Sequence, residues 1–111
     1  MEVKTRQLKR VDVVEVSGRV DSASAPRLED ALQGILNQGR FHIVVDMTGL
    51  EYLSSAGLRV LVAALKESRR WNRGDVRLAN VPERIQGVLS LAGLDVLFAG
   101  YDTTVDAVGS F

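Results

Sequence analysis

Two adjacent serines, Ser54 and Ser55, stand where a polar loop gives way to a strongly amphipathic helical pattern. The loop follows a nearly continuous apolar run over residues 41–47, which contains one acid, Asp46. Hydroxyls at a helix start lie beside unpaired backbone N–H groups and the positive end of the helix dipole, which favour negative charge. A phosphate would be accommodated there, and it would change the local charge by about −1.5 to −2. This pattern indicates a phosphorylation switch.

Spacing alone leaves two interpretations of Ser55 open. The ordinary one is a helix N-cap, because serine at that position is worth about 1 kcal/mol over alanine and caps are much commoner than switches. The other is a phosphate acceptor. The residue type and its place fit both interpretations.

Two acids are predicted at or just past the C-terminal ends of strands, the edge where open α/β sheets place their ligand sites. They are Asp21, which is followed by Ser22 and Ser24, and Asp46. Either acid could instead hold the following loop through hydrogen bonds to nearby backbone. For Asp46 the two interpretations have equal weight, because an acid near the phosphate acceptor could also orient it.

The helix that begins near Ser55 has two distinct faces. The predicted buried stripe consists of Leu58, Leu61, Val62 and Leu65, and the predicted outward face consists of Val60, Ala63, Ala64 and Glu67, with Arg59 alongside. Small apolar residues on a solvent face suit the close approach of another protein. A phosphate at the end of this face would add charge and hydration to an interface and would disrupt binding.

The remaining pattern positions these residues. Strands are predicted over residues 3–8, 11–20, 41–47 and 76–79, with an edge strand over 96–98. A first helix is predicted to start after Asp21 and to stop at Gly39, and its buried residues are Leu28, Leu32, Ile35 and Leu36. Pro82 opens a third helix that ends at Gly93, with Ile85, Val88, Leu89 and Ala92 buried, and a terminal helix covers residues 103–108. Strands that alternate with helices predict a largely parallel sheet, whereas the first two, joined by a short turn, are expected to be antiparallel. The predicted fold class is α/β, a mixed and mostly parallel β-sheet with packed α-helices.

Composition narrows the function classes. The 111 residues fit one domain, residues 1–111, and 14 basic residues balance 14 acidic ones, so no overall field attracts nucleic acid or an anionic membrane. No run approaches the roughly 20 apolar residues that span a bilayer, and the N-terminus lacks the apolar core of a signal peptide. With no cysteine, the chain fits a reducing cytosol. We therefore expect a cytoplasmic protein that does not insert into membranes.

No constellation of residues supports catalysis. His42, the only histidine, lies in an apolar strand, where a packed or edge role is expected rather than that of a base or metal ligand. The glycines form no phosphate-cradling loop, and the basic cluster at 69–73 is typical of a helix end. We expect no enzyme activity, no metal and no cofactor.

The central residues also carry a family resemblance. Asp46-Met47-Thr48, followed by Tyr52-Leu53-Ser54-Ser55-Ala56-Gly57-Leu58-Arg59-Val60-Leu61, resembles the signature of the STAS domain, and in particular that of the bacterial anti-sigma factor antagonists. The similarity extends to Val16-Ser17-Gly18-Arg19-Val20-Asp21, Asn80-Val81-Pro82 and Leu91-Ala92-Gly93-Leu94, so that it covers nearly the whole chain. The resemblance implies the same mixed sheet with helices packed over it.

The resemblance also assigns roles to residues. The family's phosphate acceptor is the serine two positions before the motif glycine, which is Ser55 here, and Ser54 stands where several members have aspartate. The implied partner-binding surface comprises Asp21, Ser22, Ser24, Asp46, Ser54, Ala56, Gly57, Leu58, Arg59, Val60 and Ala63.

The implied function is a protein–protein switch that regulates transcription. The unphosphorylated protein would bind an anti-sigma factor with serine-kinase activity, which uses ATP and magnesium to phosphorylate Ser55; a PP2C-type phosphatase would reverse the modification. A monomer or weak dimer is expected. Two alternatives remain: a STAS subunit of a lipid-transport or signalling assembly that works without phosphorylation, and a small enzyme or nucleotide-binding protein that uses the strand-end acids and Ser55.

Overall fold

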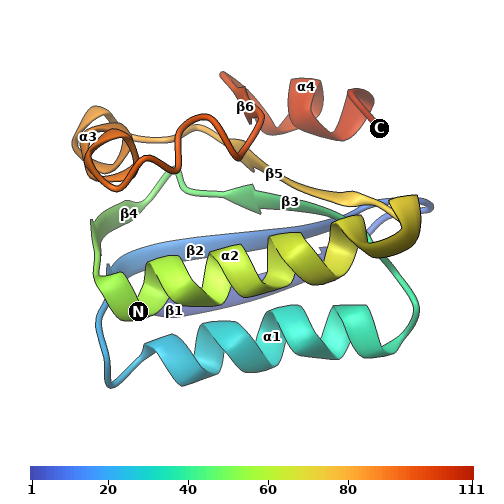
Figure 1. Ribbon diagram of the computed structural model, residues 1–111, viewed down its shortest axis with the longest axis horizontal. Helices are drawn as coiled ribbons and strands as arrows, with labels where there is room; N and C mark the ends of the chain where they lie inside the picture. The colour runs from blue at the N-terminus through green and yellow to red at the C-terminus, as the bar shows by residue number, and fades with distance from the viewer.

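A computed structural model describes the whole chain, residues 1–111, as one six-stranded sheet with helices against it (Figure 1). The strands are β1 (Glu2–Gln7), β2 (Asp12–Val20), β3 (His42–Asp46), β4 (Leu50–Leu53), β5 (Asp75–Ala79) and β6 (Gly100–Tyr101). The helices are α1 (Ala25–Asn37), α2 (Ser55–Arg69), α3 (Glu83–Leu91) and α4 (Thr104–Gly109), with a single 3₁₀ turn, η1 (Arg70–Asn72). None of these helices combines the length and the apolar character needed to cross a bilayer.

The sheet is mixed, as the sequence predicts. Its strand order is β1-β2-β3-β5-β6, and β4 pairs with the far part of β2. Only β1 and β2 are antiparallel, because a short turn over residues 8–11 joins them; every other pair is parallel. This confirms the predicted α/β fold class.

The central strands β2 and β3 are apolar on both faces because helices cover both. Ile43 and Val45 belong to the large core beneath α1 and α2, whereas Val44 points to the other face and packs with Ala107 of α4. The side chains of β2 alternate in the same way: Val14 and Val16 belong to the large core, and Val13 belongs to the smaller cluster on the other face of the sheet. The valine-rich strands therefore match the two-sided burial inferred from the sequence.

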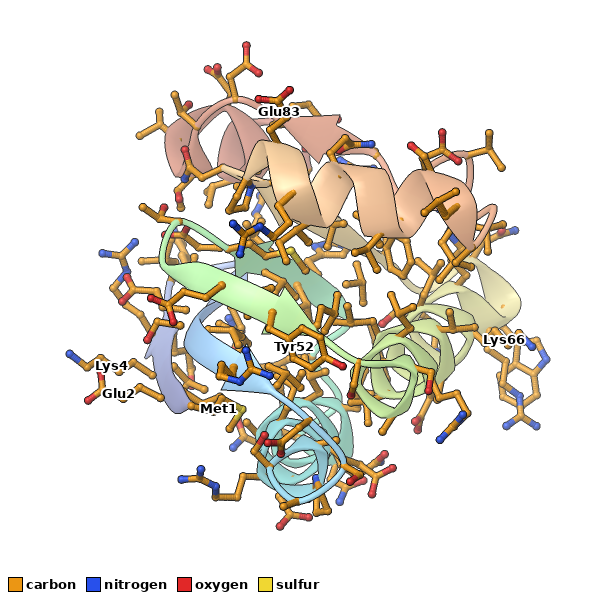
Figure 2. All side chains as sticks on the ribbon, turned by 90° about the vertical axis from the view of Figure 1, so that its left-hand side faces the viewer. Met1, Glu2, Lys4, Tyr52, Lys66 and Glu83 are labelled. Carbon is orange, nitrogen blue, oxygen red and sulfur yellow. The ribbon has the colours of Figure 1, made fainter.

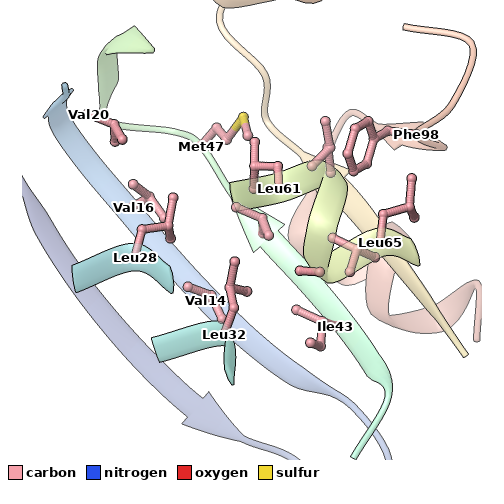
Figure 3. Close-up of a cluster of buried hydrophobic side chains, with 14 of the residues drawn as sticks. Val14, Val16, Val20, Leu28, Leu32, Ile43, Met47, Leu61, Leu65 and Phe98 are labelled. Carbon is pink, nitrogen blue, oxygen red and sulfur yellow. The ribbon is translucent and has the colours of Figure 1, made fainter. Parts of the chain in front are cut away.

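The large core lies between the sheet and the paired helices α1 and α2 (Figure 3). Helix α1 contributes its four predicted residues, Leu28, Leu32, Ile35 and Leu36. In α2, Leu61 and Leu65 are buried, and Leu58 and Val62 are partly buried against the same cluster. Ala64 was predicted on the outward face of α2 but is buried, because α2 packs beside α1 as well as over the sheet.

Three further predictions from the sequence are wrong. Residues 50–53 form strand β4 rather than a polar loop; Leu50 and Leu53 point inward while Glu51 and Tyr52 are exposed, a spacing that lacks the two-residue period of a strand. Residues 96–98 form a turn, and the edge strand is β6. Ala92, predicted to be buried, is exposed where α3 ends, and the left-handed Gly93 follows with a φ of 71°.

We expect the substitution Gly34→Ala to stabilise the protein by about 1 kcal/mol. Gly34 lies inside α1, and an added Cβ meets no atom within 4 Å, so only the helix preference for alanine changes. Urea unfolding measures this change in the free energy of unfolding. Gly39→Ala is the matched control and should destabilise, because Gly39 ends α1 with a φ of 76°. A stability unchanged by Gly34→Ala would contradict the expectation.

Candidate functional site

The start of α2 is fixed against the end of β2. The parallel strands β2 and β4 end together, with Val20 opposite Leu53, and the N–H of Ser54 donates to the carbonyl oxygen of Val20 at 2.8 Å. The turn after β2 and the first turn of α2 therefore meet at one edge of the sheet. The turn after β2 contains Asp21 and Ser22, which directly follow Val20, the residue that binds the N–H of Ser54.

The N-cap of α2 is Ser54 and not Ser55. The Ser54 Oγ accepts a hydrogen bond from the N–H of Gly57 at 3.3 Å, and its extended backbone is typical of a capping residue. Ser55 is the first helical residue; its side chain is exposed and its hydroxyl makes no hydrogen bond within the protein. The cap interpretation of Ser55 is therefore wrong, and the hydroxyl of Ser55 is left without a structural role.

Asp21 organises the turn that precedes α1. Its Oδ1 accepts hydrogen bonds from the N–H of Ser24 at 2.9 Å, the Ser24 hydroxyl at 3.0 Å and the N–H of Ala23 at 3.1 Å. Hydrogen bonds from Ser24, first from its backbone and then from its side chain, hold the pKa of Asp21 below its ordinary value of 3.8. Ser24 is buried, and its Oγ accepts from the N–H of Asp21 at 2.9 Å, whereas Ser22 is exposed.

Asp46 holds the loop between β3 and β4. Its Oδ1 accepts from the Thr48 hydroxyl at 2.6 Å, the N–H of Thr48 at 3.0 Å and the Nδ2 of Asn80 at 3.1 Å, and it has no hydrogen bond to either serine. Partial burial raises the pKa of Asp46, but the hydrogen bonds from Thr48 and Asn80 outweigh this effect and bring it below 3.8. These contacts favour the loop-holding interpretation over that of an acid that orients Ser55.

Replacing Asp46 by asparagine should destabilise the protein by about 1 kcal/mol at neutral pH, because charge-assisted hydrogen bonds are lost. A carboxyl whose folded pKa is depressed adds stability that is present above its unfolded pKa, and this is lost as the pH falls through the folded pKa. The gap between wild type and Asp46→Asn should therefore narrow below a pH of about 3.8. Urea unfolding across the acid range measures it, with Asp30→Asn on the exposed face of α1 as the control. A gap independent of pH would contradict this assignment.

The predicted partner-binding residues of α2 differ in what they can offer. Arg59 and Ala63 are exposed, and Ala56, Leu58 and Val60 are partly buried. Val60 and Ala63 line a shallow groove between α1 and α2, together with Glu29, Leu32, Gln33, Leu36, Ala64 and Glu67. Gly57 and Ser24 are both buried. They therefore support the surface, and their exposed neighbours are the residues that a partner can contact.

Sequence reasoning missed two contributors to this edge. The guanidinium of Arg19 lies 4.3 Å from the ring centroid of Tyr52, its partner across the β2–β4 pair, and Tyr52 is 39% exposed (Figure 2). Asn80 joins Asp46 to Thr104, whose Oγ1 is 3.2 Å from the Asn80 Nδ2, and it has a φ of 54°. Tyr52 is the one aromatic residue of a polar segment, and Asn80 precedes Val81-Pro82 and belongs to a residue type that tolerates a positive φ. These two features of the sequence could have indicated their roles. His42 stacks on Phe111 at 4.7 Å, consistent with a packed histidine.

Comparison with known proteins gives this geometry a family. A family model described as "Mlab, STAS domain" matches residues 3–99. The anti-sigma-B factor antagonist of Listeria monocytogenes is 29% identical over 94 residues, which are 85% of this chain and 81% of that protein. The crystal structure of an anti-sigma factor antagonist from Mycobacterium paratuberculosis is similar with a TM-score of 0.82 and 29% identity, over 98% of this chain and 92% of that one.

The fold alone is also shared at lower identity. The phosphorylated form of the Bacillus cell fate determinant SpoIIAA is similar with a TM-score of 0.78 at 16% identity, over 98% of both chains. The mixed sheet, the loop after β3 and the serine pair at the start of α2 thus occur together with a family match over most of the sequence. The chain belongs to the STAS domain family.

Proposed function

We propose that this protein is an anti-sigma factor antagonist, which binds an anti-sigma factor with serine-kinase activity and loses that partner when Ser55 is phosphorylated. The names of its relatives support the first half of the proposal. The second half rests on the division of roles between the two serines. Ser54 caps α2 with its side chain, while the Ser55 hydroxyl is exposed and without a partner.

Chemistry at Ser55 fits a kinase reaction. In the transfer, the Ser55 Oγ forms a bond to the γ-phosphorus of ATP, the bond between that phosphorus and the bridging oxygen of ADP breaks, and the hydroxyl proton passes to a base of the kinase. The product would sit at the positive end of α2, and Arg59, one turn further on, lies on the same side of the helix. The helix would therefore tolerate the phosphate without unfolding.

Loss of the partner follows from the surroundings of Ser55. Ser22, Ser55 and Arg59 are exposed at this edge, and the groove between α1 and α2 is lined from Glu29 and Val60 onward, further along both helices. A group that carries about −1.5 to −2 charges must lose its hydration if a partner covers it, and any acid of the partner repels it. A PP2C-type phosphatase would hydrolyse the ester and restore the binding form.

Phosphate mapping tests the proposal. The purified protein is incubated with lysate of the native organism and ATP, proteins captured with it are identified, and the modified residue is located by mass spectrometry. We expect a serine kinase among the captured proteins and phosphate on Ser55, with none on Ser55→Ala. Ser54→Ala is the matched control: it should lose about 1 kcal/mol of stability with the cap but still be phosphorylated. Capture of a complex without a kinase, and no phosphate on Ser55, would support a constitutive STAS subunit instead.

A further inference from the structure

A second surface lies at the opposite end of α2 from Ser55. Here an apolar groove of about 330 Å³ runs between α2 and the turn that follows α3, with Val62, Leu65 and Leu97 as its apolar lining. Leu97 is 38% exposed and its neighbour Val96 is 84% exposed. The groove is large enough to receive an apolar side chain from another molecule.

Cations alone complete the lining of this groove: Lys66, Arg69 and Arg70. Arg69 has a structural role, because its Nε lies 2.8 Å from an Asp75 carboxylate oxygen and its NH2 group donates to the carbonyl oxygen of Leu97 at 2.7 Å. Lys66 and Arg70 form no salt bridge, and both are exposed. Figure 2 shows Lys66 extending outward from α2. The acid Asp95 lies in the adjoining turn, near the Ser90 hydroxyl at 3.4 Å, and does not line the groove.

An exposed tryptophan extends this cationic rim. Trp71 is 79% exposed, and the Arg70 guanidinium lies 4.9 Å from its ring centroid. Trp71 and Asn72 both have left-handed backbones, with φ of 58° and 56°. A bulky residue adopts this conformation at an energetic cost, and such strain is concentrated at functional sites. The turn thus holds a large aromatic side chain in solvent next to Arg70, which lines the groove.

We infer that this surface, made of Val62, Lys66, Arg70, Trp71, Val96 and Leu97, docks an acidic segment of a partner protein. An apolar side chain of the segment enters the groove, and its carboxylates meet Lys66 and Arg70, which have no acid of their own. Tryptophan and arginine are the residues that most often dominate binding at interfaces. A concave groove fits a protruding side chain better than it fits a flat anionic membrane.

This docking surface is independent of the proposed phosphorylation. Lys66 follows Ser55 by eleven residues on one helix, which places it about 16 Å along the axis. Binding at the groove should therefore be the same for wild type and Ser55→Asp. Failure of the docking proposal would leave the phosphorylation proposal standing, and the reverse also holds.

Trp71 is the only tryptophan of the chain, and its ring lies 4.9 Å from the guanidinium of Arg70, which lines the groove, so its fluorescence reports on a ligand bound at this rim. The probes are synthetic peptides of roughly twelve residues, three helical turns, that combine glutamate with leucine and phenylalanine. Two matched sets replace glutamate by lysine or the apolar residues by serine, and vesicles of phosphatidylglycerol or phosphatidylcholine test for a membrane. We expect a blue shift of the emission with acidic apolar peptides only.

Charge reversal locates the contact. The double variant Lys66→Glu with Arg70→Glu should bind the acidic peptides at least about tenfold more weakly, whereas Arg84→Glu, a single charge reversal on the exposed face of α3, should bind as wild type does. Trp71→Gly should keep or raise the melting temperature, because the left-handed backbone suits glycine, and yet weaken binding of a labelled peptide several-fold.

Three results would overturn the inference. No fluorescence shift with any acidic peptide removes the docking surface, and equal shifts with acidic and basic peptides remove its charge selectivity. A shift with phosphatidylglycerol vesicles but not with peptides would assign the surface to a membrane instead.

Discussion

Replacing Ser55 by aspartate should weaken binding to the proposed kinase partner about a hundredfold, a loss of about 2.7 kcal/mol. A carboxylate at the first position of α2 is tolerated by the helix, since it lies at the positive end of the dipole. In the complex, however, it would be desolvated without a partner, and an unpaired charge buried in an interface costs about 2–5 kcal/mol. Ser55→Ala should bind as tightly as wild type and should resist inactivation by ATP. Calorimetry with the purified kinase measures both affinities.

Two further variants separate charge at the site from charge in general. Gln86→Glu adds one negative charge on exposed α3, away from the start of α2, and should leave the affinity unchanged. Ser54→Ala removes the cap but no interface charge, so its effect should appear in stability before affinity. If Ser55→Asp bound the kinase as tightly as Ser55→Ala, the phosphorylation mechanism would have to be abandoned.

Much of the frame that positions Ser55 could be predicted from the sequence because its elements have strong periodic patterns. The apolar stripe of α1 has the helical spacing, and the residues of β3 are apolar throughout, so length and pattern distinguish helix from strand. The glycines at the ends of α1 and α3, Gly39 and Gly93, have the left-handed backbones expected of helix ends. The alternation of these elements then determines the parallel sheet.

The parts that could not be predicted depend on tertiary contacts. Strand β4 is only four residues long, and pairing with β2 maintains its extended form. The residues of β4 alone do not predict this pairing. Residues 96–98 are apolar enough for a strand, yet the turn there is held by Arg69 from α2. Asp46 finds its partner in Asn80, 34 residues away, a contact that no local pattern contains.

The serine pair shows the same limit at the scale of a single residue. A helix boundary read from periodicity is uncertain by one or two positions, and Ser54 and Ser55 differ by one. The hydrogen bond from Ser54 to Val20 sets where β4 ends, and with it which hydroxyl caps α2. This one-residue choice decides which serine remains free for chemistry.

Gly57→Ala should destabilise the protein by about 1–2 kcal/mol, opposite in sign to Gly34→Ala although both glycines lie in helices. A Cβ at Gly57 would lie 2.6 Å from Leu53 Cδ1 and 2.8 Å from Val20 Cγ1, distances that require the packing to shift. Leu53 and Val20 are buried core residues at the paired strand ends, so the space is not easily made. Overpacking of this kind costs about 1–3 kcal/mol. The helix preference for alanine over glycine returns about 1 kcal/mol, so the net effect over most of this range is destabilising.

The same change should also affect Ser55, the proposed phosphorylation site. The N–H of Gly57 donates to the Ser54 cap, so moving Gly57 away from the sheet alters the cap and the direction of the Ser55 hydroxyl. Under conditions where Gly57→Ala is fully folded, the rate of Ser55 phosphorylation should fall, while Gly34→Ala should be modified at the wild-type rate. Urea unfolding and a phosphorylation time course measure the two effects. If Gly57→Ala were as stable as wild type, α2 would be able to move away from the strand ends at no cost. The close approach of Gly57 to Leu53 and Val20 would then not be the feature that positions Ser55.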